Sequence, residues 1–256
     1  MNVNHSNSFA ILENTFGLIG LFIKSVQLVP QAYKNWRNKS TGGLSFAMLI
    51  IWALSAVFLG IYSIVIQLSI PLIIQPQLFT TLSLICFVQC LYYDNPYFIG
   101  KKVKTSLLFA CICIVGAVFQ SVSIFGIRVA NEKNIRWPET VCGISSTVLC
   151  MIGYIPQFYT IYREKIVRGI SLIFLTLDMT GNLFYLISLV FRPPPFAVLA
   201  ALYYLTIFTF DLIIMLLYYL LNWIKNKASL KLEQSGQDNL EVVVDLTVAD
   251  KIDLVD

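Results

Sequence analysis

Seven long apolar segments constrain the fold of this chain more than any other feature. An α-helix needs about 20 apolar residues to cross a bilayer core of about 30 Å, and each segment is at least about that long. The segments cover residues 12–33, 44–67, 71–93, 105–127, 138–160, 170–191 and 196–223. We therefore expect an all-α membrane protein with seven transmembrane helices.

The composition excludes several classes of protein. Hydrophobic residues make up 57% of the chain and charged residues 12%, whereas soluble domains are about 25% charged. A soluble enzyme, a nucleic-acid-binding protein and a disordered chain are therefore excluded. We find no Ser/His/Asp set, phosphate loop or metal motif, so we expect no enzyme, metal or cofactor. The six cysteines lie in apolar runs without zinc-site spacing: Cys86, Cys90, Cys111, Cys113, Cys142 and Cys150.

Basic residues are concentrated in alternate loops, which predicts the orientation of the helices. Only Arg128, Lys133, Arg136 and Arg192 lie in the opposite loops. We therefore expect a lumenal N-terminus and a cytosolic C-terminus. The twelve on the expected cytosolic side are Lys34, Arg37, Lys39, Lys101, Lys102, Lys104, Arg163, Lys165, Arg168, Lys225, Lys227 and Lys231.

The two ends of the chain are polar. Residues 1–11 lack the basic region of a removable signal peptide, and we expect them to form a lumenal tail. Asn4 begins the sequon Asn4-His5-Ser6 and is a candidate glycosylation site there. Residues 224–256 are rich in Asp and Glu, which predicts a disordered cytosolic tail.

The chain contains an internal repeat without gaps. A shift of 126 residues places Pro30 on Pro156 and Gln31 on Gln157. Chance pairing of apolar residues does not explain polar and proline identities that stay in register. Further identical pairs are Gly17/Gly143, Tyr33/Tyr159, Arg37/Arg163, Lys39/Lys165, Gly43/Gly169 and Ser45/Ser171.

The repeat predicts how the helices are grouped. Residues 12–93 and 138–223 form two repeats of three helices each, and residues 94–137 link them through the fourth helix, 105–127. An odd number of helices in the linker gives both repeats the same orientation. We therefore expect two parallel three-helix bundles in a 3+1+3 arrangement, with a substrate site between them near the bilayer midplane.

The repeated motifs resemble those of a known family. Val29-Pro30-Gln31 with Gly43-Leu44-Ser45, and Ile155-Pro156-Gln157 with Gly169-Ile170-Ser171, are similar to the PQ-loop repeat family. That family includes cystinosin and vacuolar cationic amino-acid exporters, and it shares its fold with SWEET sugar transporters. Leu177-Asp178-Met179-Thr180-Gly181 and Phe210-Asp211 resemble cystinosin motifs, although the whole pattern looks closer to uncharacterised fungal members.

Two aspartates within the apolar segments are the main candidate site residues. Asp178 lies roughly 12 Å and Asp211 roughly 18 Å from the expected cytosolic ends of their helices at 1.5 Å per residue. A charged carboxylate is costly there and is usually paired, protonated or beside water. Asp178 is therefore the first candidate for a proton carrier and Asp211 the second, with structural hydrogen bonding as the alternative.

Two further polar residues are candidates for the same site. Asn182 lies one turn beyond Asp178 on the same helix face. Lys24 lies in the middle of the first segment, and the repeat places Cys150 at its equivalent position. Lys24 either neutralises an aspartate, meets a substrate carboxylate or extends to the interface. We expect three glutamines of the third segment to join helices rather than bind substrate: Gln75, Gln77 and Gln89.

The prolines of the repeat are candidate hinges. Pro30 and Pro156 each remove a helix hydrogen bond near the expected cytosolic end of a helix, and Gln31 and Gln157 are placed to partner the freed groups. We interpret these four residues as a gate that bends. A fixed kink that ends each helix is the alternative.

These observations, with the resemblance, imply a function. We expect a proton-coupled secondary transporter that exports a small polar solute, with an amino acid as the first expectation, from an acidic organelle to the cytosol. A vacuolar or lysosomal membrane is the first expectation, with the Golgi or endoplasmic reticulum as alternatives. The competing hypothesis is a non-transporting membrane receptor or a trafficking or lipid-linked-sugar factor with this fold. Expected partners are the solute, protons and the bilayer, without nucleic acid, and a homo-oligomer is left open.

Overall fold

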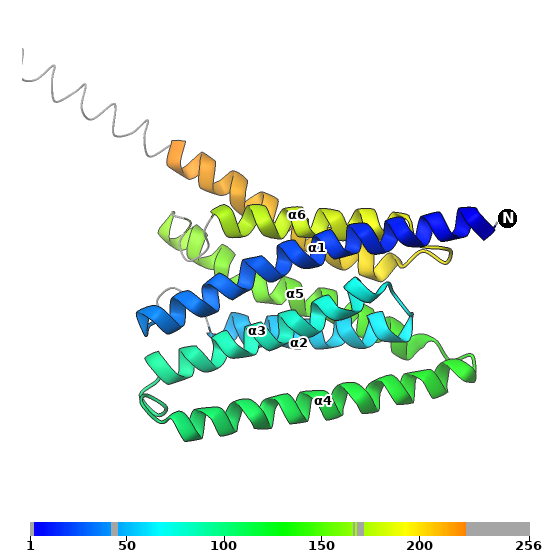
Figure 1. Ribbon diagram of the computed structural model, residues 1–256. Helices are drawn as coiled ribbons and strands as arrows, with labels where there is room; N and C mark the ends of the chain where they lie inside the picture. The colour runs from blue at the N-terminus through cyan, green and yellow to red at the C-terminus, as the bar shows by residue number, and fades with distance from the viewer. Residues whose placement is uncertain (1–2, 42–45, 166, 168–171, 224–256) are drawn as a thin grey trace, which may run out of the picture.

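The computed structural model describes residues 3–41, 46–165, 167 and 172–223, and every element assigned in these residues is helical. Figure 1 shows long helices lying roughly side by side along one direction. In chain order they are α1 (Val3–Asn38), α2 (Phe46–Val65), α3 (Ile70–Asp94), α4 (Lys102–Glu132), α5 (Trp137–Glu164), α6 (Leu172–Val190) and a last helix, Val198–Trp223.

Six helices in the described residues are long and apolar enough to cross a membrane, namely α2 to α6 and the last helix. The all-helical membrane class is therefore confirmed. Helix α1 is not among the six found in the described residues. A seventh membrane-spanning helix thus stays a prediction.

Helix α1 is longer than the apolar segment on which it was predicted. It begins at Val3 and contains 36 residues, which is about 54 Å at 1.5 Å per residue. The backbone of residues 3–11, expected as a tail, therefore continues the helix. The side chain of Asn4 and the predicted tail 224–256 lie outside the described part of the chain.

The prolines of the repeat lie inside their helices rather than at the ends. Helix α1 continues past Pro30 to Asn38, and α5 continues past Pro156 to Glu164. A proline in a helix interior removes one hydrogen bond of the ladder, so each helix has a weakened turn within it. The helices therefore do not end at these prolines, and a fixed kink remains the alternative to a hinge.

The connections between helices alternate between the two ends of the bundle. In Figure 1 the N-terminus and the α2–α3, α4–α5 and α6–last-helix connections lie at one end, and the C-terminal ends of α1, α3 and α5 lie at the other. Lys34, Lys101 and Arg163 are therefore at the same end of the molecule. We call this the basic end.

The packing of the helices follows the sequence repeat. Helix α1 packs against α3 and α6, and α2 packs against α3 and α5, while α4 lies to one side against α2 and α3. The shift of 126 residues relates α1 to α5 and α2 to α6. The α1–α6 and α2–α5 interfaces are therefore equivalent under the repeat.

A close contact in each of these interfaces occurs at equivalent residues. A Cβ atom added to Gly20 of α1 would lie 3.1 Å from the carbonyl oxygen of Gly181 in α6. At the corresponding positions, Ser55 Oγ of α2 donates a 2.7 Å hydrogen bond to the carbonyl oxygen of Ser146 in α5. The small residues let the helix backbones approach closely, as is usual between membrane helices.

One contact joins equivalent residues of the two halves directly. Arg192, after α6, donates a 2.6 Å hydrogen bond from Nη2 to the carbonyl oxygen of Ile66, after α2. These two residues are 126 positions apart, which is the repeat distance. Glu13 of α1 is buried nearby, and its carboxyl group interacts electrostatically with Arg192. This contact lies at the end opposite the basic end.

Candidate functional site

A buried ion pair crosses the α1–α6 interface. Lys24 Nζ of α1 lies 2.5 Å from Asp178 Oδ1 of α6, and the two side chains are 5% and 6% exposed. Sequence reasoning left three positions open for Lys24. The structure places Lys24 against Asp178. Lys24 does not extend to the membrane surface, because its whole side chain is buried.

Gly181 makes room for the aliphatic part of Lys24. It lies one helical turn beyond Asp178, and a Cβ atom added there would lie 2.8 Å from Lys24 Cγ. Real Cβ atoms essentially never approach another atom so closely. The absence of a side chain at 181 therefore allows the lysine stem to cross α6 and reach the aspartate.

Asp211 of the last helix lies beside this pair. It is 1% exposed, and Tyr154 of α5 donates a 2.9 Å hydrogen bond from its hydroxyl group to Asp211 Oδ1. Asp178 is near enough for the two carboxyl groups to interact electrostatically. Asp211 Oδ2 meets no hydrogen-bond donor among the described residues.

Asn182 joins the group, as expected from its spacing. Its side chain is fully buried, and Nδ2 lies 3.4 Å from Asp178 Oδ2. This distance is at the long end for a hydrogen bond, so the contact is weak. All four predicted site residues of the membrane interior, Lys24, Asp178, Asn182 and Asp211, are therefore in one cluster.

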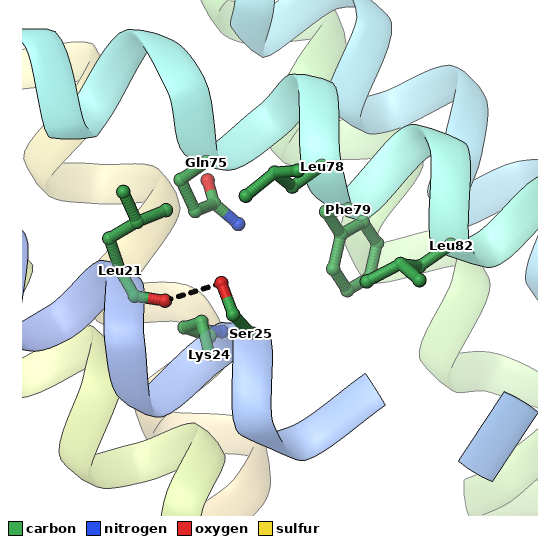
Figure 2. Close-up of a pocket in the computed structure, with 7 residues that line it drawn as sticks. All are labelled: Leu21, Lys24, Ser25, Gln75, Leu78, Phe79 and Leu82. Carbon is green, nitrogen blue, oxygen red and sulfur yellow. Dashed lines mark hydrogen bonds between the residues drawn. The ribbon is translucent and has the colours of Figure 1, made fainter. Parts of the chain in front are cut away.

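Two small cavities meet at Lys24. The first lies between α1 and α3, and Figure 2 shows Gln75 of α3 extending toward Lys24 and Ser25 of α1. The second lies among five helices, from both repeats. Its lining residues are Lys24, Trp52, Gln75, Phe79, Cys150, Tyr154, Tyr203 and Ile207. We call it the central cavity.

Gln75 lines both cavities and was missed as a site residue by sequence reasoning. Its side chain is buried, and Oε1 has no hydrogen-bond partner in the part of the chain that the structure describes. Gln89 behaves as expected, because it joins α3 to α1 through hydrogen bonds with Asn35 and the Ala32 carbonyl oxygen, each 3.0 Å long. The signal for Gln75 was an amide directly before Pro76 in an otherwise apolar stretch.

The α2–α5 interface carries aromatic rings at the positions where the α1–α6 interface carries charged side chains. Trp52 of α2 occupies the position equivalent to Asp178, and its ring lies against Gly153 and 5.1 Å from the ring of Tyr154. Cys150 occupies the position equivalent to Lys24 and is also buried. The two interfaces share a backbone arrangement but differ in chemistry, so the central cavity is electrostatically asymmetric.

The predicted gate residues lie between this cluster and the basic end. Pro156 comes two residues after Tyr154 on α5, and Pro30 comes six residues after Lys24 on α1. Neither proline lines a cavity described here. Gln157 is buried, and the side chain of Gln31 lies outside the described residues. Both weakened turns are thus on helices that supply cavity residues.

Comparison with known proteins agrees with the repeat. The family model described as PQ loop repeat matches residues 12–72 and 139–198. An uncharacterised protein of Schizosaccharomyces pombe is 34% identical over 226 residues, which are 88% of this chain and 77% of that protein. Bovine cystinosin is 26% identical over 206 residues, 73% of this chain and 54% of its own length.

A shorter match is to a vacuolar histidine transporter of Saccharomyces cerevisiae, 32% identical over 84 residues, which are 33% of this chain and 28% of the transporter. The chain thus spans about half the length of the cystinosin that it matches, and nearly four fifths of the fission-yeast relative. Two matched repeats and this extended similarity lead to one conclusion: the chain belongs to the PQ-loop repeat family.

Proposed function

We propose that this protein is a proton-coupled secondary transporter that moves a small polar solute, an amino acid by class, from an acidic organelle to the cytosol. The observation that carries the proposal is the buried cluster of Lys24, Asp178 and Asp211 beside a cavity formed by both repeats. Charged groups inside a membrane are costly, and they are a feature of substrate and proton pathways.

The named relatives support the solute class and the membrane. They include vacuolar transporters of histidine and lysine, and also cystinosin. We therefore propose the vacuolar or lysosomal membrane as the location. The basic end would face the cytosol, since loops rich in Lys and Arg stay on that side.

The fold proposed for this function is the 3+1+3 arrangement of parallel repeats, 12–93 and 138–223, joined by α4. Its support is the equivalence of the α1–α6 and α2–α5 interfaces, where close contacts occur at corresponding residues. A digestion experiment tests the orientation. A C-terminal tag should be removed by protease added to intact vacuoles, and protection of the tag would contradict the cytosolic assignment.

Within the cluster, we assign the coupled proton to Asp211 rather than to Asp178, which the sequence made the first candidate. Asp178 is directly paired with a lysine, and this pairing stabilises its charged form. Asp211 interacts electrostatically with that carboxylate, and among the described residues no cation lies within hydrogen-bonding distance of Asp211. Like charges in contact disfavour double ionisation, so Asp211 is the group that takes up and releases the proton.

The weakened turns at Pro30 and Pro156 provide the bending in this proposal. They would let α1 and α5 open the basic end, with Gln31 and Gln157 near the freed backbone groups. Bending there would move Lys24 and Tyr154, and both contact the aspartates. The movement of the helices and the protonation of Asp211 are thereby linked.

Flux in proteoliposomes tests the function. The purified protein should accumulate at least one amino acid from a panel when a pH gradient is imposed, and dissipating the gradient should abolish accumulation. Asp211→Asn should retain exchange of labelled for unlabelled solute but lose gradient-driven accumulation. A protein that binds an amino acid without exchange or net flux would instead be a receptor.

A further inference from the structure

We propose that Lys24 is a specificity-determining residue of the central cavity: it selects solutes that present a carboxylate and rejects those that carry an additional positive charge. The inference rests on the proposed transport function and specifies which solutes that site accepts. It applies to Lys24 itself, because the equivalent position in the second repeat is the uncharged Cys150.

The position of the Lys24 ammonium group is the first observation. Lys24 lines both cavities, and its side chain is 5% exposed. In the described residues Nζ makes one hydrogen bond, to Asp178 Oδ1, although a lysine ammonium group has three donors. Donors therefore remain for a solute in the adjoining cavity. Removal from water strengthens the interaction of this charge with a solute.

Two uncharged polar groups in the same cavity also await partners. Trp52 Nε1, a donor, and Gln75 Oε1, an acceptor, are buried and have no hydrogen-bond partner among the described residues. A buried polar group without a partner is costly, and a solute that brings an acceptor and a donor would satisfy both. The carboxylate and the α-ammonium group of an amino acid supply these two groups.

Among the described residues, no aspartate or glutamate lines the central cavity, which argues against a cationic side chain. Asp178 pairs with Lys24, and Asp211 accepts the hydrogen bond of Tyr154. The other titratable groups that line the central cavity are Cys150, Tyr154 and Tyr203, all neutral in their usual protonated forms. A second cation would therefore meet the ammonium group of Lys24 without a carboxylate of its own.

Competition measurements test the inference. Exchange of a transported neutral amino acid, chosen from glycine, serine and leucine, is measured in proteoliposomes at fixed pH. Lysine and arginine should compete at least tenfold more weakly than the neutral amino acids. Short carboxylic acids such as propionate should compete more strongly than amines of the same length.

Variants separate the charge from its effect on folding. Lys24→Met should reduce the preference for neutral over cationic amino acids at least tenfold. If that variant does not fold, Lys24→Met/Asp178→Asn has no unpaired buried charge and should reduce the preference likewise. Lys104→Met removes a lysine outside the cavities and should leave the preference unchanged.

The outcomes distinguish the two proposals. Failure of every amino acid to exchange would overturn the transport function, and the inference with it. Exchange of lysine as readily as of neutral amino acids would overturn the inference alone. An unchanged preference in a folded Lys24 variant would do the same, because a purely structural ion pair does not set the ratio of two solutes.

Discussion

The hydroxyl group of Tyr154 in α5 donates a hydrogen bond to Oδ1 of Asp211 in the last helix. Asp211 is the residue to which we assign the coupled proton. Tyr154→Phe removes this donor and keeps the ring. We expect slower gradient-driven transport, because the carboxyl group has lost a hydrogen-bond partner. Proteoliposome flux across a pH series measures this. Tyr159→Phe, at an exposed position of the same helix, is the control and should match the unaltered protein.

The ion pair predicts unequal stability effects for the two aspartates. Asp178→Asn leaves Lys24 as an unpaired buried cation, and breaking a buried pair in this way costs about 3–5 kcal/mol. Asp211→Asn should cost far less, because the group that it replaces is neutral when protonated. Thermal unfolding in detergent at mildly acidic pH compares them.

The double variant Lys24→Met/Asp178→Asn completes this comparison. It removes both charges together, so it should recover most of the stability that Asp178→Asn loses. Equal melting temperatures for Asp178→Asn and the double variant would show that Lys24 does not depend on Asp178 for its burial.

Gly181 offers a steric test of the lysine position. Gly181→Ala adds a Cβ atom that would lie 2.8 Å from Lys24 Cγ, and we expect the displaced ammonium group to reduce transport severalfold. Gly116→Ala in α4 is the matched control, since no atom lies within 4 Å of its added Cβ. That control should keep full transport and gain up to about 1 kcal/mol from helix propensity. Similar transport in both variants would argue against close packing of Lys24 on α6.

Pro156 allows the hinge to be separated from the binding site. Pro156→Ala restores a backbone donor in the interior of α5 and should stiffen that turn. We expect a lower rate of transport with an unchanged Kd for the solute, because Pro156 does not line the central cavity. Pro138→Ala, in the first turn of the same helix, removes a proline where no ladder bond is missing. An effect of equal size there would place the rate-limiting motion elsewhere.

The sequence predicted helical elements because their signal is local. Each apolar run that was long enough became a helix, and the shift of 126 residues related the helices that form equivalent interfaces. The start of α1 was less predictable. Residues 3–11 are too polar to be assigned to a membrane span, but backbone hydrogen bonding can continue beyond an apolar segment whatever the side chains are.

The sequence predicted which residues belong to the site better than it predicted which of them are in contact. Costly residues in apolar helices, such as Lys24 and Asp178, are visible as exceptions. Which of them touch depends on the rotation and register of α1 against α6, and these follow from Gly20 and Gly181 at the crossing. Gln75 was missed because an amide that joins helices and an amide that faces a cavity are the same residue type in a sequence.

The hydrogen bond from Arg192 to Ile66 sets a simple condition for opening the end opposite the basic loops. The two residues correspond under the repeat and lie in different halves. The two halves can therefore separate at this point only if this hydrogen bond breaks. A bond from a charged donor contributes about 1.5–3 kcal/mol, which alone favours the shut arrangement about 10- to 150-fold. In the proposed transport cycle, this hydrogen bond would keep the form that is open at this end a minority species.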